Sequence, residues 1–210
     1  MGAKHIGEIE FLCSIAKPNY GLITNVGKAH LEGFGGIEGV KKGKSELYRY
    51  LESINGTVFI NHDDLTLNSL CLSNKKYSYG ISEEADLKGS IVAEKQNLEI
   101  KWETQTEKGF AKSQLFGNYN FSNILAAIAV GNFFRVKSND IDEAIENYKP
   151  EMNRSQLIVK DNYHILLDAY NANPSSMIVA LNNFEKFKAS KKYVVLGVRI
   201  VLGVDSGVVL

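Results

Sequence analysis

The sequence predicts an α/β protein in which a mostly parallel sheet is flanked by helices and accompanied by a small antiparallel sheet. Two observations support this fold class. Short apolar runs such as residues 57–61 stand between segments with helical spacing, which is typical of buried parallel strands. Residues 91–116 instead alternate polar and apolar side chains, which is typical of antiparallel strands with one exposed face.

The first half of the chain begins with a helical pattern. Ile9, Leu12 and Ile15 have helical spacing, and Pro18 ends that helix. The segments that we expect next are a strand at 21–26, a glycine-rich loop over 27–36, a helix from about residue 38 to 53, and a buried strand at 57–61.

The second half first shows the alternating strands and then returns to helical spacing. We expect antiparallel strands at 91–94, 98–103 and 110–116, followed by helices at 123–129 and 139–148. The second of these helices stops before Pro150, and residues 150–154 form the best domain boundary in the chain.

Beyond this boundary the pattern predicts a partial second α/β unit of the Rossmann-like type. We expect a strand pair at 156–159 and 164–168, and a buried strand at 193–197. Between them a helix starts at Pro174 with Asn173 as its N-cap, and its buried stripe is Met177, Leu181 and Phe184. These elements are too few to bury both faces of a parallel sheet, so we expect a chain that is truncated on its C-terminal side.

The composition excludes several classes of protein. The 210 residues include 24 Lys and Arg against 24 Asp and Glu, and 44% are hydrophobic. These values exclude a disordered tail and a nucleic-acid binder whose affinity comes from net positive charge. No run reaches the roughly 18 apolar residues of a membrane span. Residues 1–10 lack a signal-peptide pattern, so we expect a cytoplasmic protein with Cys13 and Cys71 as buried free thiols.

Lys44 is the most unusual residue of the expected helix over 38–53. It occupies one position of an apolar stripe that is otherwise made of Ile37, Val40, Leu47 and Leu51. One interpretation is that its amine extends along the helix to reach water. The other is a desolvated lysine with a lowered pKa, whose neutral amine can be modified, for instance by carbon dioxide to give a carbamate.

His30 has the best context of the four histidines for a metal or catalytic role. It follows an expected strand end, and ligands bind at the C-terminal strand ends of open α/β sheets. A packing role for this histidine is equally compatible with the pattern. The nearby segment 39–45 is not a phosphate-binding loop, because only three residues separate its glycines and it lies within an expected helix.

Four further residues have a structural and a functional interpretation each. Asn120 and Asn123 lie three apart at a helix start, either as a capping cluster or as an amide pair that binds a base or sugar. Arg154 is a surface charge or a phosphate ligand. Asp168, at an expected strand end, is a turn residue or a ribose ligand.

Taken together, several segments resemble the Mur ligase family. They are MGAKHIGEI at 1–9, TNVGKAHLEGFG at 24–35, Lys44 with Glu46, GNYNFSN at 117–123, NRSQ at 153–156 and DAYNANPSSM at 168–177. Their order and spacing cover the chain to about residue 197. The last motif is specific for the member of the family that adds D-alanyl-D-alanine.

The resemblance implies a reaction in cytoplasmic peptidoglycan precursor synthesis. ATP phosphorylates the terminal carboxylate of UDP-N-acetylmuramoyl-tripeptide, and the amine of D-alanyl-D-alanine attacks the resulting acyl phosphate. The implied cofactors are ATP and Mg²⁺, and the implied protein is a monomer with no nucleic-acid partner. Residues 1–153 then correspond to the central ATPase domain without its phosphate-loop segment, and residues 154–210 to a truncated start of the C-terminal domain.

The resemblance also implies roles for the candidate residues. His30 is similar to a magnesium ligand of the family, and Lys44 to the carbamylated lysine whose carboxylate binds a second magnesium ion. Asn120 and Asn123 match the adenine-side asparagines, and Arg154 the arginine that contacts phosphate. Asp168 matches the ribose-binding aspartate.

The chain also departs from the family pattern. The phosphate-binding loop and a magnesium-binding Glu would stand before Met1, and the family's Leu-Gly-Asp-Met-x-Glu-Leu-Gly is replaced at 196–203 by LGVRIVLG. We therefore expect this piece to be inactive by itself. The alternatives are a catalytically dead fragment that binds nucleotide or a partner, a muropeptide recycling ligase, and a folylpolyglutamate synthase. The segment YNANPSSM argues against the last two.

Overall fold

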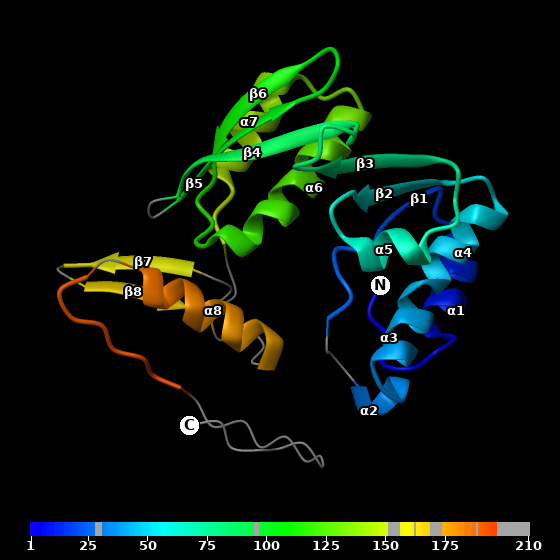
Figure 1. Cartoon of the computed structure of the whole chain (residues 1–210), viewed down its shortest axis with the longest axis horizontal. Coiled ribbons are helices and arrows are strands. Elements are labelled where there is room, and N and C mark those ends of the chain that lie inside the picture. The colour runs from blue at the N-terminus through cyan, green and yellow to red at the C-terminus, as the bar shows by residue number, and fades with distance from the viewer. Residues whose placement is uncertain are drawn as a thin grey trace.

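A computed structural model of the chain describes residues 1–27, 31–94, 97–150, 156–161, 163–168, 174–187 and 189–196. Figure 1 shows two groups of elements: a six-stranded sheet with helices around it, and a two-stranded sheet with one helix. The predicted fold class is confirmed: a mostly parallel sheet is flanked by helices, and a small antiparallel sheet of two strands accompanies it, although at residues 156–167 rather than in the middle of the chain. Across the described segments, no helix has the length and apolar character that crossing a bilayer requires.

The N-terminal elements follow the predicted order, but two short helices at 31–34 and 65–70 were not expected, one strand is shorter and one helix is divided. The order is α1 (Glu8–Ala16), β1 (Tyr20–Leu22), α2 (Leu31–Phe34), α3 (Ile37–Lys44), α4 (Glu46–Ser53), β2 (Thr57–Asn61) and α5 (Leu65–Leu70). The expected strand at 21–26 is shorter, because the chain leaves the sheet after Leu22. The expected single helix over 38–53 is divided at Ser45, whose hydroxyl donates to the Lys42 carbonyl at 2.9 Å and so competes with the regular backbone pattern.

The remaining strands extend the same sheet. They are β3 (Lys76–Gly80), β4 (Leu87–Glu94), β5 (Leu98–Glu103) and β6 (Lys108–Lys112), and the spatial order is β1 to β6. Strands β1 to β4 pair in parallel, whereas β4–β5 and β5–β6 are antiparallel, as the alternating pattern predicts. These antiparallel strands are not a separate sheet, because the start of β4 pairs with β3 through Tyr79 and Leu87.

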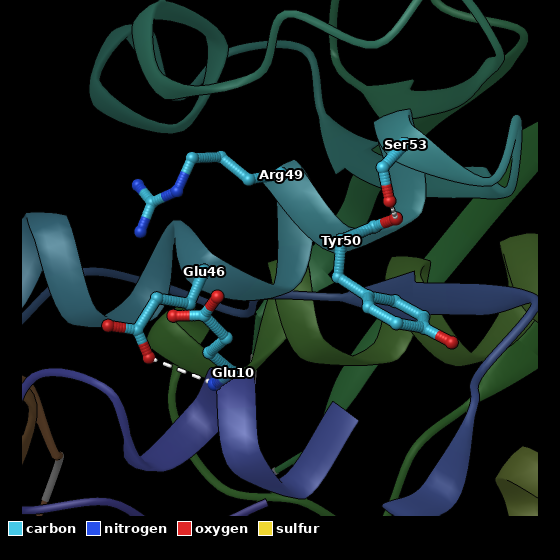
Figure 2. A pocket seen from close by; sticks show the side chains of 5 residues that line it. All are labelled: Glu10, Glu46, Arg49, Tyr50 and Ser53. Atoms are coloured by element: carbon cyan, nitrogen blue, oxygen red, sulfur yellow. Dashed lines mark hydrogen bonds between the residues drawn. The ribbon is translucent and has the colours of Figure 1, made fainter. Parts of the chain in front are cut away.

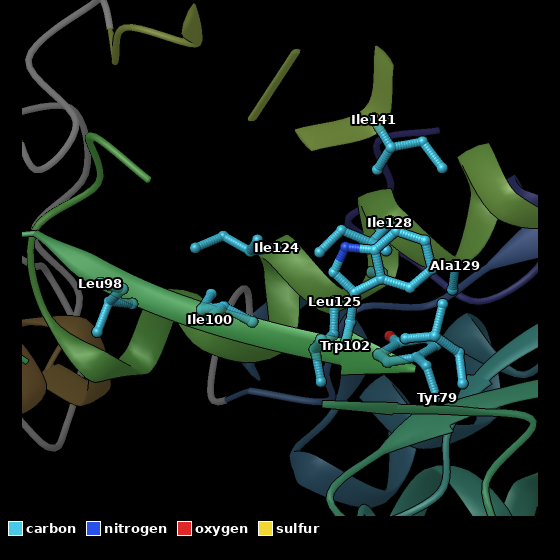
Figure 3. Close-up of a cluster of buried hydrophobic side chains, with 11 residues drawn as sticks. Tyr79, Leu98, Ile100, Trp102, Ile124, Leu125, Ile128, Ala129 and Ile141 are labelled. Atoms are coloured by element: carbon cyan, nitrogen blue, oxygen red, sulfur yellow. The ribbon is translucent and has the colours of Figure 1, made fainter. Parts of the chain in front are cut away.

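Two helical layers cover the sheet. Side chains alternate along β2, so Val58 and Ile60 pack with α4 and α5, while Phe59 faces the opposite side and its ring lies 5.1 Å from that of Phe133. That opposite side is covered by α6 (Phe121–Phe133), which follows a short 3-10 turn, η1 (Asn118–Asn120), and precedes α7 (Ser138–Asn147). Figure 3 shows the larger core, in which Trp102 and Tyr79 of the sheet pack among residues of α6.

The second group of elements is a hairpin with one helix. Strands β7 (Gln156–Lys160) and β8 (Tyr163–Leu167) are antiparallel, and α8 spans Pro174–Lys186, so the predicted strand pair and the start of the helix at Pro174 are confirmed. The hairpin residues Leu157 and Leu166 line a small cavity with Phe184 and Phe187. The ring of Phe187 also lies 5.7 Å from that of Phe116 in the first group.

Two expectations for this second group are wrong. Leu181 is 38% exposed, and Met177 and Phe184 are partly exposed, so they do not form a buried stripe. Residues 193–196 form no strand, and Val195 is 95% exposed, because no neighbouring strand among the described residues offers hydrogen-bond partners. Residue 197 lies outside the described part of the chain.

Candidate functional site

The segment that leaves β1 is where the structure places Lys44. The lysine is the last residue of α3 and is half-buried, and its Nζ donates to the backbone carbonyl of Asn25 at 2.7 Å. Burial lowers the pKa of the Lys44 ammonium. The side chain therefore reaches the strand end that the sequence indicated, and its amine is easier to deprotonate than that of a lysine in water.

The N-terminal segment folds back onto the start of α1. The Glu8 carboxylate accepts from the backbone N–H of Lys4 at 2.7 Å and lies 3.0 Å from Nδ1 of His5. The bond from Lys4, which is the larger cause, and the contact with His5 hold the pKa of Glu8 below its ordinary value. This arrangement gives residues 4–8, part of the MGAKHIGEI motif, a defined local structure.

Gly33 of α2 lies against this N-terminal segment. A Cβ atom at position 33 would stand 2.4 Å from the backbone oxygen of Lys4, so only glycine permits the close approach. The contact joins two of the sequence motifs, residues 1–9 and residues 24–35, across the fold. In the sequence Gly33 is only one position of the glycine-rich loop expected over 27–36, and no local pattern identifies Lys4 as its partner.

Glu46 connects a third motif to the same place. It is the first residue of α4, is 2% exposed, and accepts from the backbone N–H of Gly7 at 2.6 Å and of Glu10 at 3.0 Å. Figure 2 shows its carboxylate beside α1, in a surface pocket lined by Glu10, Glu46, Arg49, Tyr50 and Ser53. The segments around residues 1–10, 24–35 and 44–46 thus meet in one region of the molecule.

The two asparagines lie at the start of α6, as expected, but differ from each other. Asn120 is buried, and its Nδ2 donates to the Phe116 carbonyl at 2.8 Å. It is the N-cap residue of α6, but its side chain makes no capping hydrogen bond, so it is held by the preceding turn rather than acting as a cap. Asn123 is exposed, and its Nδ2 lies 3.5 Å from Oδ1 of Asn120. Asn123 is therefore the member of the pair that a ligand from solvent can reach.

The remaining candidates are placed only in part. Asp168 is half-exposed and directly follows β8, as the pattern predicted. His30, Arg154 and the segment 169–173 lie outside the described residues. In the part of the chain that is described, no three His, Cys, Asp or Glu side chains gather as a metal site. Cys13 and Cys71 are buried free thiols, as expected.

The magnesium site implied by the resemblance can be tested on Lys44. Mg²⁺ prefers hard oxygen ligands, which an ammonium does not provide and a carbamate does. A carbamate nitrogen keeps one N–H, so the hydrogen bond to Asn25 can persist after modification. The lowered pKa and this bond both fit a carbamylated lysine.

Comparison with known proteins gives matches over most of the chain. The family model described as "Mur ligase middle domain" matches residues 1–131. The UDP-N-acetylmuramoyl-tripeptide–D-alanyl-D-alanine ligase of Bacillus subtilis is 30% identical over 208 residues, which are 97% of this chain and 44% of the relative. The Escherichia coli ligase of the same name is 32% identical over 187 residues, 86% of this chain and 41% of the relative.

Solved structures agree in fold. A crystal structure of MurF from Acinetobacter baumannii has a TM-score of 0.78 and 28% identity, and the match covers 90% of this chain and 42% of that one. MurF ligase from Thermotoga maritima, solved in complex with ADP, has a TM-score of 0.76 at 23% identity over 90% of this chain and 44% of that one. The chain thus spans less than half the length of the relatives it matches.

Proposed function

The chain belongs to the Mur ligase family, and we propose that it is part of an ATP-dependent ligase that adds D-alanyl-D-alanine to UDP-N-acetylmuramoyl-tripeptide. The choice within the family is supported by relatives of that name at 30% and 32% identity over most of the chain. The structural observation that carries the proposal is Lys44, whose desolvated amine contacts the segment that leaves β1.

Lys44 acts in this proposal as a carbamylated residue. Its neutral amine attacks carbon dioxide, a nitrogen–carbon bond forms, and one proton leaves the nitrogen, which yields an anionic carbamate. Burial favours this step because it lowers the pKa of the ammonium and so raises the fraction of neutral amine. A second gain is charge: the carbamate replaces a half-buried cation with an anion suited to a divalent cation.

The other candidates take the roles that the family resemblance implies. His30 and the Lys44 carbamate would hold magnesium, Arg154 would contact phosphate, and Asn123 and Asp168 would bind the nucleoside of ATP. Asn120 contributes indirectly, because its bond to the Phe116 carbonyl fixes the turn from which Asn123 projects. ATP, when bound with magnesium, supplies the phosphoryl group that activates the substrate carboxylate as an acyl phosphate.

The proposal also covers the organisation of the protein. Residues 1–153 form the central domain, which agrees with the match over residues 1–131, and residues 154–210 begin the C-terminal domain. The protein works as a monomer in the cytoplasm in peptidoglycan precursor synthesis. The 210-residue chain by itself is inactive.

The experiment is a Lys44→Ala substitution in the protein expressed from its complete coding sequence. We expect ADP release that depends on D-alanyl-D-alanine to fall by about 100-fold or more, because a charged group that stabilises the transition state is lost. A short-chain carboxylate such as propionate should partly restore it. Lys42→Ala is the matched control, since Lys42 is exposed on the same helix. Full activity in Lys44→Ala would contradict the proposal.

A second measurement separates the members of the family. The unmodified protein is assayed in three mixtures. Two contain UDP-N-acetylmuramoyl-tripeptide, with either D-alanyl-D-alanine or a single amino acid, and the third contains a folate with glutamate. We expect product with D-alanyl-D-alanine alone. Product with either of the other acceptors would place the protein elsewhere among the ligases.

A further inference from the structure

Helix α1 begins without a capping side chain of its own. Its N-cap residue is Gly7, with a φ of 92°, and no side chain of the preceding segment bonds to the first turn as a cap. The first N–H groups of any helix lack partners within the helix and need acceptors from elsewhere. A Ser, Thr, Asp or Asn side chain at the N-cap is the preferred source of one such acceptor.

Glu46 supplies the acceptors from a different helix. One carboxylate oxygen accepts from Gly7 and the other from Glu10, at 2.6 and 3.0 Å, across 39 and 36 positions of the sequence. The dashed line that ends at the backbone nitrogen of Glu10 in Figure 2 marks the second of these bonds. Because the side chain is 2% exposed, both oxygens are committed to α1 and shielded from water.

Burying a carboxylate in this way is costly unless it is well compensated. Two hydrogen bonds to a charged acceptor, and the positive end of the α1 dipole, offset the desolvation of Glu46. A serine at position 7 would cap the helix without burying a charge. Unlike a local cap, the Glu46 carboxylate joins the start of α1 to the start of α4.

The position of Glu46 gives this junction a consequence for the site. Glu46 stands two residues after Lys44, on the other side of the division between α3 and α4 at Ser45. Gly7 ends the segment that folds against Glu8 and contacts Gly33 through Lys4. One carboxylate therefore ties the end of the N-terminal segment, which also contacts Gly33 of α2, to the start of the helix that follows Lys44.

We propose that Glu46 is a positioning residue of the ligase site, an inference that rests on the proposed function. Its carboxylate caps α1 from outside and thereby holds the N-terminal segment in register with Lys44. Glu46 does not itself touch a substrate in this scheme. Loss of the junction lets residues 1–7 shift relative to Lys44, and shifts of about 1 Å at a catalytic site can lower the rate by about 100-fold.

The test uses Glu46→Gln in the protein expressed from its complete coding sequence. Glutamine has nearly the same shape, but its NH₂ group faces a backbone N–H where a carboxylate oxygen stood. We expect kcat to fall by about 10- to 100-fold, while the KM for D-alanyl-D-alanine stays within about twofold of the wild type. Glu52→Gln, on the exposed side of the same helix, is the control and should change neither value.

Hydrogen exchange measured by NMR gives a readout that does not depend on activity. In Glu46→Gln the protection of the Gly7 and Glu10 amides against exchange should fall by about tenfold or more. Neither amide then has a charged acceptor, and one of them faces the glutamine NH₂ group, which cannot accept. The amides of β2 and β3 should keep theirs. Glu46→Asp, which retains the charge but is one methylene shorter, should lie between the wild type and Glu46→Gln in both readouts.

The outcomes separate this inference from the proposed function. Wild-type kcat in Glu46→Gln would overturn the positioning role, and so would a loss of protection that spreads through β2 and β3, since that marks a general structural defect. A wild-type protein that lacks the D-alanyl-D-alanine ligase reaction would overturn the proposed function instead. In that case exchange at Gly7 and Glu10 still decides whether Glu46 caps α1.

Discussion

The first group of elements, the six-stranded sheet with its helices, buries its apolar side chains, whereas the second group, the hairpin with α8, leaves most of its apolar side chains exposed. They are called the first unit and the hairpin unit below. In the first unit Leu51, Trp102 and Ile128 are each at most 1% exposed. Among the described residues from 156 to 196, Asn183 is the one buried side chain. Tyr193 is 79% exposed and Val195 95%.

The difference follows from the number of layers in each unit. The six-stranded sheet has α4 and α5 on one face and α6 on the other, so residues that alternate along β2 are buried on both sides. The hairpin has α8 on one face, and Ile158 and Ile165 on the other face are 37% and 45% exposed. The stability of this chain therefore resides mainly in the six-stranded sheet and its helices.

The largest expected effect comes from removing the central aromatic residue of the first unit. Trp102 packs in the core of Figure 3, and its Nε1 donates to the Asp142 carboxylate at 2.7 Å. We expect Trp102→Ala to lower the free energy of unfolding by about 3–5 kcal/mol, through lost burial and a cavity. Denaturant unfolding followed by circular dichroism measures this loss, and a value below about 1 kcal/mol would show that the core around Trp102 contributes little to stability.

A smaller effect is expected where the N-terminal motifs touch. Gly33→Ala places a Cβ against the backbone oxygen of Lys4, and neither backbone can move away cheaply. We expect a loss of about 1–3 kcal/mol in the free energy of unfolding. Gly2→Ala is a suitable control, because a Cβ there meets nothing within 4 Å. Equal stability of the two variants would show that the contact between the motifs is not tight.

The first unit should also lose stability in alkali. Burial, the largest cause, raises the pKa of Tyr77 and of Tyr79 to about 12, and the carboxylates of Asp86 and Glu107 add to the shift of Tyr77. An unfolded tyrosine loses its proton near pH 10. The folded state therefore holds protons that the unfolded state releases, so stability is complete below about pH 10 and falls as the pH rises toward 12.

Unfolding series at pH 9, 10 and 11 measure this slope. Tyr77→Phe should make the fall with pH shallower. It also removes the 2.7 Å bond from the Tyr77 hydroxyl to Asn132, so the slope rather than the absolute stability is the readout. Tyr163→Phe changes an exposed ring of the hairpin unit and should leave the slope as it is. An unchanged slope in Tyr77→Phe would argue against the burial of that hydroxyl.

The smallest effect is expected on the uncovered face of the hairpin. Ile165→Ala removes a half-exposed side chain, and such surface changes stay within about 0.5 kcal/mol of the wild type. This substitution tests whether the face of the hairpin that carries Ile165 is exposed in solution. A loss of more than about 1.5 kcal/mol in the free energy of unfolding would show that this face is covered in solution, which would break the contrast between the two units.

The order of the elements could be read from the sequence because it depends on local periodicity. The strands at 57–61 and 98–103 and the helix that begins at Pro174 are found where the patterns put them, whereas the strand expected at 110–116 runs over 108–112 and the one expected at 91–94 begins at residue 87. Lys44 was also recognisable, because a charge in an apolar stripe is visible without a structure. The division at Ser45 was not, because it depends on one hydroxyl bonding the backbone three residues earlier.

The strand expected at 193–197 shows where such reasoning stops. The run of apolar residues there has the composition of a buried strand, yet residues 193–196 are exposed and unpaired with any described strand. A strand is defined by its neighbours, which supply hydrogen bonds and cover both faces. The composition of a segment shows that it can form a strand, but not whether another strand lies next to it and pairs with it.

The fold class, most of the longer elements and the family resemblance follow from the type and spacing of nearby residues, and so could be predicted without a structure. The tertiary structure alone decided that β4 continues the parallel sheet, that Gly33 faces Lys4, and that Glu46 caps α1. The physical reason is the same in each case. Hydrogen bonds and close packing join atoms that are near in space, and residues 7 and 46 become neighbours only after the helices between them have folded.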